Sequence, residues 1–308
     1  MLETFTMRNK LSILLFVLVA VCNNLYAQEP ADTTDLMAQL EKESEDKNVV
    51  NYTTATFKTT RLVNGHTVEN VGKGVLDVKI SHRFGTLNKG GYELFGLDNA
   101  TMRMGLDYGI SKRLMVGAGR STYQKTYDAF LKFKLLRQST GKKNMPFTVS
   151  YVGTVALMTL KWADTSRKNY FSSRLSYTHQ LIIGSKLSEG TSLQLMPTYI
   201  HRNLAALAND PNDLYAIGIG GRQKLTKRLS FNVEYYYQIP KYKVAGTANP
   251  LSVGFDIETG GHVFQLHFTN STAMAERAFI SGTTGKWGKG DILFGFNISR
   301  VFTIGKHK

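Results

Sequence analysis

Hydrophobic and polar residues alternate along most of the chain after residue 75. Within residues 229–239 the odd positions are apolar or aromatic and the even positions are mostly polar, and residues 262–270 and 291–303 repeat the pattern. Because successive side chains of a β-strand point to opposite faces, each such segment has one apolar and one polar face. The pattern predicts about twelve strands (ten to fourteen), at residues 75–84, 102–110, 114–121, 127–137, 147–157, 171–184, 192–202, 215–225, 229–239, 251–259, 262–270 and 291–303.

The connections between these predicted strands alternate between long and short. The odd-numbered ones, at residues 85–101, 122–126, 158–170, 203–214, 240–250 and 271–290, average about thirteen residues, and the even-numbered ones, at 111–113, 138–146, 185–191, 226–228 and 260–261, average about five. Outer-membrane barrels have long loops at one end, short turns at the other and an even number of strands. The sequence therefore predicts an all-β fold, a single antiparallel up-and-down transmembrane β-barrel.

A soluble exported β-protein, either a sandwich or a lipocalin-like barrel, is the alternative, because it would alternate in the same way. Most of the predicted strands have nine or more residues, longer than ordinary strands. Aromatic residues such as Tyr108, Tyr127 and Phe147 stand near predicted strand ends, as interfacial girdles do. Both features favour the membrane barrel.

The first fifty residues have a different character. Residues 1–27 combine a basic head, an apolar run at 11–21 and a small residue, Ala27, which is the layout of a signal peptide. Residues 28–50 hold seven acids and two bases and are predicted to form an acidic periplasmic tether, with a barrel plug or docking helix as the alternative. Residues 51–308 are assigned to the barrel. The protein is expected in the cell outer membrane, exported through a cleaved signal peptide, with both termini periplasmic.

Composition and charge narrow the expected chemistry and partners. The chain of 308 residues is 42% hydrophobic, carries a net charge of +15 and has one cysteine, Cys22. Loss of the signal peptide would remove that cysteine. Lysines and arginines gather in the predicted turns and loops, where phosphorylated glycolipid would attract them. The expected partners are outer-membrane lipid and lipopolysaccharide, and the barrel-assembly machinery during insertion. Nucleic acid is not expected, and the sequence leaves the oligomeric state open.

Charged residues occur on the polar face of the predicted strands, which should line the lumen. They either form a paired network that braces a narrow barrel or line a water-filled pore with a mild preference for anions, and sequence leaves both open. Glycines on the same face, among them Gly117 and Gly218, either make room for bulky neighbours or widen the passage. The candidate lumen residues are Asp77, Lys79, Arg83, Arg103, Asp107, Asp128, Lys132, Lys134, Arg174, Arg222, Lys224 and Glu234.

No catalytic, metal or cofactor motif stands out. The seven histidines are scattered without metal-site spacing, and the glycine-rich stretches open no predicted helix that could hold a phosphate. A lipid-acting enzyme is the remaining enzymatic alternative, because His82 and His201 fall on the lipid face near the predicted rim. No nucleophile signature accompanies them. We expect no enzyme activity, no cofactor and no metal.

Several strings resemble an uncharacterised family of β-barrel outer-membrane proteins from Bacteroidetes, a domain of unknown function. They are HRFG (82–85), LFGLD (94–98), GAGRS (117–121), YDAFLKFKLLRQ (127–138) and GFDIETGGHVFQLHFTNS (254–271). The resemblance covers roughly residues 50–305 and implies an outer-membrane barrel with no established activity. The last string predicts a hairpin turning at Gly260 and Gly261. If the family has a functional site, the first place to look is the face of this hairpin that carries Asp256, Glu258, Gln265 and His267.

The function that these features favour is a narrow pore or transporter for small solutes. The alternative is a non-conducting scaffold or docking barrel of an envelope complex, with a lipid-acting outer-membrane enzyme as a third hypothesis. The sequence does not identify a solute.

Overall fold

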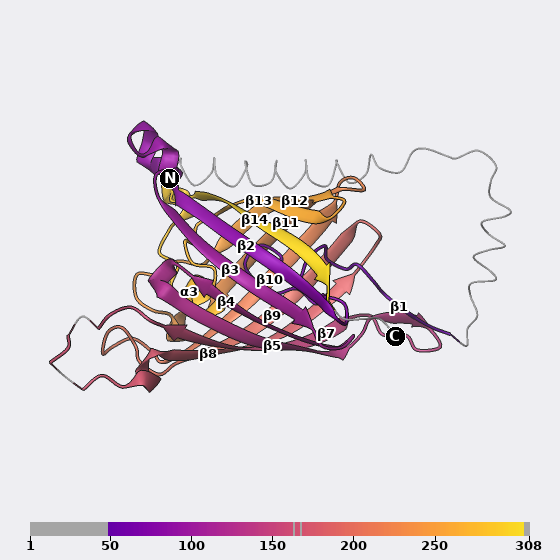
Figure 1. The fold of residues 1–308 in the computed structure, drawn as a ribbon, viewed down its shortest axis with the longest axis horizontal. Coiled ribbons are helices and arrows are strands. Elements are labelled where there is room, and N and C mark those ends of the chain that lie inside the picture. Colours follow the sequence, from indigo (N-terminus) through magenta and orange to yellow (C-terminus); the bar gives the residue numbers. More distant parts are fainter. Residues whose placement is uncertain (1–48, 163, 167, 305–308) are drawn as a thin grey trace, which may run out of the picture. The chain divides into compact units, whose positions relative to one another are not determined.

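The computed structural model describes residues 49–162, 164–166 and 168–304. The predicted signal peptide and nearly all of the acidic tether lie outside these residues. From Val50 onward the chain forms one compact unit, built around a closed antiparallel β-barrel whose strands run obliquely around it (Figure 1).

Twelve strands make the barrel wall, in the number and order that the alternation predicts. Their bounds differ from the predicted ones by at most four residues, the largest difference being at the start of β8. The wall strands are β2 (Val75–Thr86), β3 (Ala100–Gly109), β4 (Leu114–Ser121), β5 (Thr126–Leu136), β7 (Thr148–Met158), β8 (Leu175–Lys186), β9 (Thr191–Arg202), β10 (Asp213–Lys224), β11 (Leu229–Gln238), β12 (Leu251–Thr259), β13 (His262–Thr269) and β14 (Leu293–Thr303).

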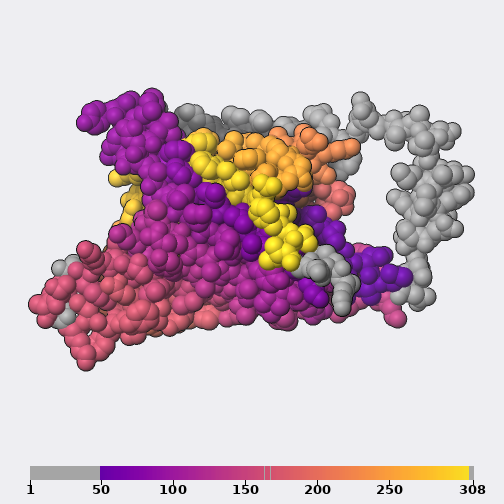
Figure 2. All heavy atoms as spheres, viewed as in Figure 1, coloured from indigo at the N-terminus to yellow at the C-terminus, as the bar shows by residue number. Residues whose placement is uncertain are grey.

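The barrel closes where the last wall strand meets the first. β14 pairs antiparallel with β2 from Leu293–Thr86 to Thr303–Val75, with one register shift between Leu293 and Gly295. Figure 2 shows β14, in yellow, lying against β2 on the outer surface. Closure leaves neither strand with a free edge. A sheet that spans a membrane must be closed in this way, because unpaired backbone groups at an edge cannot hydrogen-bond to lipid.

The two ends of the barrel differ in their connections. Residues 110–113, 137–147, 187–190, 225–228 and 260–261 join strands at one end, here the turn end. The segments at the other end, the loop end, are longer on average, with residues 122–125 as the exception. The loop end carries η1 (Leu87–Gly96), η2 (Tyr123–Lys125), η3 (Phe171–Arg174), η4 (Pro240–Tyr242), α3 (Glu276–Ser281) and η5 (Trp287–Lys289). At the turn end, β1 (Val50–Tyr52) pairs with β6 (Ser139–Gly141) in a separate two-stranded sheet.

Side chains of the wall strands alternate between a buried interior and an exposed exterior. On β3, Met104 and Leu106 are each 52% exposed, whereas Arg103 and Asp107 are 4% and 1% exposed. The apolar face therefore points outward and the charged face inward, as a strand between lipid and lumen demands. None of the helices in the described part of the chain is long and apolar enough to cross a membrane.

The sequence did not predict what fills the lumen. Residues 53–74, here called the lumen plug, leave β1 and end at β2, and residues 56–68 are almost entirely buried. Leu62 donates a backbone hydrogen bond to Gly65 (2.8 Å), and Arg61 and His66 form an isolated β-bridge. The plug is therefore a hairpin whose tip is the turn at residues 62–65.

Candidate functional site

The lumen plug enters and leaves the barrel at the same end. Thr53 donates its backbone hydrogen bond to Gln138 (2.9 Å), beside β6, and Gly74 donates to Gly109 (2.8 Å), the last residue of β3. Both contacts lie at the turn end. The plug is thus an inserted hairpin that does not thread through the barrel.

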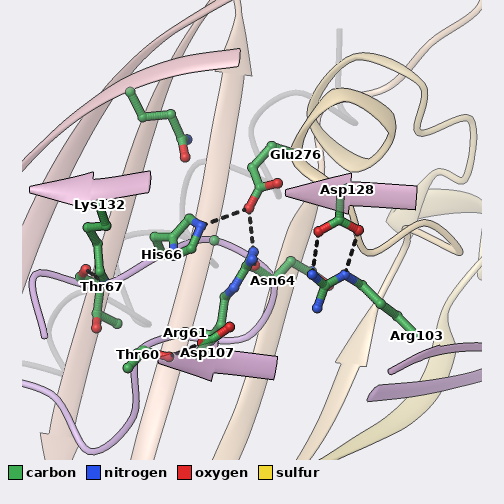
Figure 3. A network of polar contacts seen from close by, with 12 residues as sticks. Thr60, Arg61, Asn64, His66, Thr67, Arg103, Asp107, Asp128, Lys132 and Glu276 are labelled. Carbon is green, nitrogen blue, oxygen red and sulfur yellow. Dashed lines mark hydrogen bonds and ion pairs between the residues drawn. The ribbon is translucent and has the colours of Figure 1, made fainter. Parts of the chain in front are cut away.

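A second segment of the chain meets the plug from the loop end. Helix α3 belongs to the connection between β13 and β14, and Phe279 and Ile280 are 0% and 1% exposed. Glu276, at the start of α3, is also fully buried; its carboxylate pairs with Arg61 and lies 3.3 Å from His66 Nε2. Figure 3 shows both plug side chains directed at this carboxylate.

Ion pairs inside the lumen join strands of the wall. Arg103 on β3 donates two hydrogen bonds to the carboxylate of Asp128 on β5, one of them from Nε at 2.9 Å. Lys79 on β2 lies 2.5 Å from Asp107 and 3.1 Å from Asp77. Thr60 of the plug donates a hydrogen bond to Asp107 (3.0 Å). The sequence left open a paired network or a water-filled pore. These ion pairs are the contacts that a paired network would make.

The backbone of the plug is hydrogen-bonded to wall side chains. The carboxylate of Glu234 on β11 accepts hydrogen bonds from the amides of Val63 (3.3 Å), Asn64 (3.2 Å) and Gly65 (2.8 Å). Plug carbonyls accept hydrogen bonds in turn from wall side chains: Lys132 Nζ to Thr67 (3.0 Å), Gln194 to His66 (2.9 Å), Gln265 to Leu62 (2.8 Å) and Asn297 to Val63 (2.9 Å). The barrel interior thus satisfies polar backbone groups that burial would otherwise leave unpaired.

An apolar cluster occupies another part of the lumen. Phe57, Leu62 and Val68 of the plug pack with Phe279 of α3 and with inward side chains of the wall, which include Met115, Phe130, Val152, Ile182, Met196, Ile200 and Tyr236. A Cβ on Gly117 or Gly218 would collide with the rings of Phe130 and Tyr236 respectively. Both glycines therefore make room for a bulky neighbour and do not widen a passage.

Most of the candidate lumen residues lie where their position in the alternation places them. Asp77, Lys79, Arg83, Arg103, Asp107, Asp128, Lys132, Arg222 and Glu234 are each at most 9% exposed. Lys134 is half-buried and pairs with Glu69 of the plug at 3.9 Å.

Two of the candidates lie outside the lumen. Arg174 belongs to η3 and not to a wall strand; it donates a hydrogen bond to Met158 (2.9 Å) and stacks on Trp162 at the loop end. Lys224 is the exposed last residue of β10. Arg174 was placed in the lumen by a predicted strand bound, whereas Lys224 keeps its predicted position in the alternation and lies at the exposed end of its strand.

The predicted hairpin cluster on β12 and β13 divides into an inner and an outer part. Asp256, Gln265 and His267 are at most 5% exposed, and Gln265 donates a hydrogen bond to Asp256 (2.8 Å) while also holding the plug. Glu258 is half-buried and pairs with Lys58 of the plug. Gln265 and Glu258 of the cluster therefore contact the plug, and a functional site on this hairpin stays a prediction.

The two histidines of the lipase hypothesis have different surroundings. His201 Nδ1 lies 2.7 Å from the carboxylate of Asp213, which also accepts a hydrogen bond from Tyr199 (2.6 Å). His82 is stacked against Phe296 with ring centroids 5.1 Å apart. Within the described ranges no serine, threonine or cysteine hydrogen-bonds to either histidine, so a base with an orienting carboxylate is present at His201 without a nucleophile. The same ranges hold no group of three or more metal-binding side chains.

Comparison with known proteins gives a family. Residues 57–302 match the model of the family described as Membrane bound beta barrel domain (DUF5777). The chain therefore belongs to this family of membrane-bound β-barrels, and the resemblance inferred from the sequence is confirmed at that level. No curated protein matches the chain significantly.

Solved structures of outer-membrane proteins are similar in a general way. An outer membrane channel from Pseudomonas putida F1 is 13% identical with a TM-score of 0.47, over 76% of this chain and 98% of that one. The NanC porin is 8% identical with a TM-score of 0.45, over 75% and 100%. The KdgM porin is 9% identical with a TM-score of 0.44, over 74% and 99%. Similarity this low carries no inference about function.

Proposed function

Starting from a membrane-bound β-barrel with a filled lumen, we propose that this protein is an outer-membrane channel for small solutes that its own lumen plug holds closed. The turn end would face the periplasm, since short turns lie on that side in outer-membrane barrels. The observation that carries the proposal is the hairpin insertion of the plug. Because both ends of the plug lie at the turn end, the hairpin can withdraw without unthreading.

The chemistry of the lumen supports a passage that becomes wet when the plug withdraws. Wall strands on the side of β7 to β11 present buried hydroxyl and amide side chains inward, namely Ser150, Thr154, Ser176, Thr178, Gln180, Ser192, Gln194, Thr198, Ser230 and Asn232. Water can replace the hydrogen bond that Gln194 makes to His66 of the plug and can hydrogen-bond to the other groups. The lining would therefore tolerate hydration without leaving unpaired polar groups.

Recording in planar bilayers tests the channel. The first variant replaces residues 56–70 by a short Gly/Ser linker, and the second also replaces residues 273–283, which removes all of α3. We expect rare openings from the wild type and sustained conductance steps from at least one variant. A matched control shortens the exposed loop at residues 204–207 and should behave as the wild type. Heat-modifiable gel migration verifies that each barrel is folded. Folded variants that do not conduct would refute the channel.

A non-conducting docking barrel is the second candidate, and the apolar packing favours it. Phe57 and Leu62 of the plug are 3% and 2% exposed and pack in the same cluster as Phe279. Burial of this kind opposes withdrawal, because apolar side chains would have to enter water. A wild type that never opens at any voltage, beside a plugless variant that conducts, would favour this second function.

A further inference from the structure

A groove lies on the outer surface of the barrel wall, toward the turn end of β8, β9, β10 and β11. Its volume is about 510 Å³, within the roughly 300–1,000 Å³ of small-molecule sites. Leu193 and Ile219 are 51% and 53% exposed, so the groove is open to whatever surrounds the barrel. Its lining is almost entirely apolar and includes Ile183, Leu193, Leu195, Ile219, Gly221 and Val233.

Gly221 is the position that makes the groove. The outward positions of β10 run Ile217, Ile219, Gly221, so the row of apolar side chains is interrupted at the glycine. Its cross-strand neighbours are Leu193 on β9 and Val233 on β11. A Cβ on Gly221 would lie 3.2 Å from the side chain of Leu193 and 3.6 Å from that of Val233. A larger side chain at this position would therefore fill the groove.

The connections next to the groove carry an excess of positive charge. The arm at residues 137–147 and the turns at 187–190 and 225–228 follow or precede the strands that line it. Their exposed basic residues, with the last residue of β10, form no ion pair with any residue that the structure describes. These basic residues are Lys142, Lys143, Lys224, Lys227 and Arg228.

The acids closest to these basic residues already have partners. Glu189 is the only acid in the three connections; it pairs with Lys186 (2.8 Å) and also lies near Lys224. Glu258 follows the residue that pairs with the first residue of β11, and its carboxylate pairs with Lys58 of the plug. The basic residues at this end of the wall therefore outnumber the acids, and a negatively charged ligand would be attracted to them.

The groove and the basic connections are separated by the length of a lipid headgroup region. A strand rises by about 3.3 Å per residue, so Lys224 lies about 10 Å beyond Gly221 in the direction of the turn end. The headgroup layer of a bilayer adds roughly 5–8 Å to each side of its hydrocarbon core. With the groove inside the hydrocarbon, the basic side chains therefore reach the layer of the phosphates.

We infer that the groove and the basic connections form a binding site for one anionic glycerophospholipid, with an acyl chain in the groove and the phosphate on the lysines and arginine. A neutral lipid would fill the groove equally well but would leave these charges without a partner. A second copy of the chain is the competing occupant. A two-fold dimer, however, brings identical surfaces together, so it would bring the basic residues of both copies together.

The site shares with the proposed function only the orientation of the barrel, which puts the turn end in the leaflet opposite the long loops. It does not require that the barrel conduct. A failure to conduct in planar bilayers and a failure to bind lipid are therefore separate results.

Native mass spectrometry of the purified full chain in neutral detergent tests the site, with phosphatidylglycerol and phosphatidylcholine as the added lipids. We expect one phosphatidylglycerol to bind about tenfold more tightly than phosphatidylcholine, because each nearby base adds to the attraction for anionic lipid. A variant with Lys224→Gln, Lys227→Gln and Arg228→Gln should lose this preference. Lys112→Gln with Arg113→Gln, in the exposed turn between β3 and β4 and well away from β10 around the wall, should keep it.

Three results of this measurement would overturn the site. The first is equal binding of the two lipids by the wild type, and the second is a preference that the triple variant retains. The third is a dimer that excludes the lipid, which would assign the groove to a second copy. Heat-modifiable gel migration verifies that each variant is folded.

A photoactivatable phosphatidylglycerol, with its reactive group on an acyl chain, gives a second measurement in lipid vesicles. Its crosslinks to the wild type should concentrate at Leu193, Ile219 and Val233, whereas the same probe on phosphatidylcholine should label the outer wall diffusely. Gly221→Leu fills the groove and should abolish the concentration. If this variant does not fold, the wild-type map decides alone. Crosslinks of the phosphatidylglycerol probe spread evenly around the wall would refute the assignment.

Discussion

At the scale of single residues, one wall carboxylate holds three consecutive backbone amides of the lumen plug. Glu234 accepts from Val63, Asn64 and Gly65, and the side chain of Asn64 donates to the same carboxylate (3.3 Å) and to Ser252 (3.1 Å). Consecutive amides that converge in this way form an anion-binding concavity. The turn at the tip of the plug therefore depends on the charge of a side chain far away in the sequence.

Glu234→Gln tests that dependence with little change in shape. The glutamine offers one acceptor oxygen and turns an N–H₂ group toward backbone donors, so we expect the free energy of unfolding to fall by about 1.5–3 kcal/mol, the range for hydrogen bonds to charged groups. Denaturant titration of the solubilised protein measures the loss. Glu189→Gln, in a turn where the side chain is 90% exposed and pairs with Lys186, should cost under about 1 kcal/mol. Equal losses in the two variants would contradict the role of Glu234.

The sequence identifies which side of a strand a residue occupies but not which partner it meets. Arg103 and Asp128 were both expected in the lumen from alternation alone, and both are there. Their pairing across β4 depends on the registers of two strand pairs, which the local sequence does not determine. Arg174 shows that even the side of a strand is predicted wrongly where the strand end is wrong. The strand was predicted to begin four residues too early, which placed a loop residue in the predicted lumen.

At the scale of elements, the wall strands were predictable and the lumen contents were not. A wall strand sits between lipid and interior, so its two faces differ and the period of two appears in the sequence. Most of the plug is enclosed by the barrel, and residues 52–61 show poor alternation and belong to none of the predicted strands. The signal that could have revealed the plug is Asn64-Gly65, a common hairpin turn pair, between Leu62-Val63 and His66-Thr67-Val68.

Helix α3 provides a prediction at this scale. The ring of Phe279 is fully buried and meets the ring of Tyr236 edge-to-face, with centroids 5.4 Å apart. Phe279→Ala should lower the free energy of unfolding by about 3–5 kcal/mol, because it empties part of a packed core. Thermal unfolding in detergent measures the change. Phe171→Ala, at a loop-end residue that is 66% exposed, is the control. A loss for Phe279→Ala no larger than the loss for this control would mean that α3 is not docked in the lumen.

At the scale of the whole molecule, the wall, the lumen plug and α3 together form one closed barrel with a largely occupied lumen. The wall supplies the charged and polar lining, the plug enters from the turn end, and α3 packs against it from the loop end. Alternating connection lengths predicted which end of the barrel would carry the long loops, and this prediction is confirmed. The outer-membrane location, the signal peptide, the acidic tether and the Bacteroidetes source stay predictions, since the described residues do not bear on them.

Amide hydrogen exchange of the wild-type protein, reconstituted in lipid, tests the filled lumen most directly. The amides of Leu62, Gly65 and Thr67 are buried and hydrogen-bonded, to Gly65, Glu234 and Thr60 respectively. They should exchange as slowly as amides in the middle of the wall strands, because both require opening of the same packed interior. Exchange of these amides as rapid as that of the exposed turn at residues 187–190 would show that residues 53–74 do not occupy the lumen.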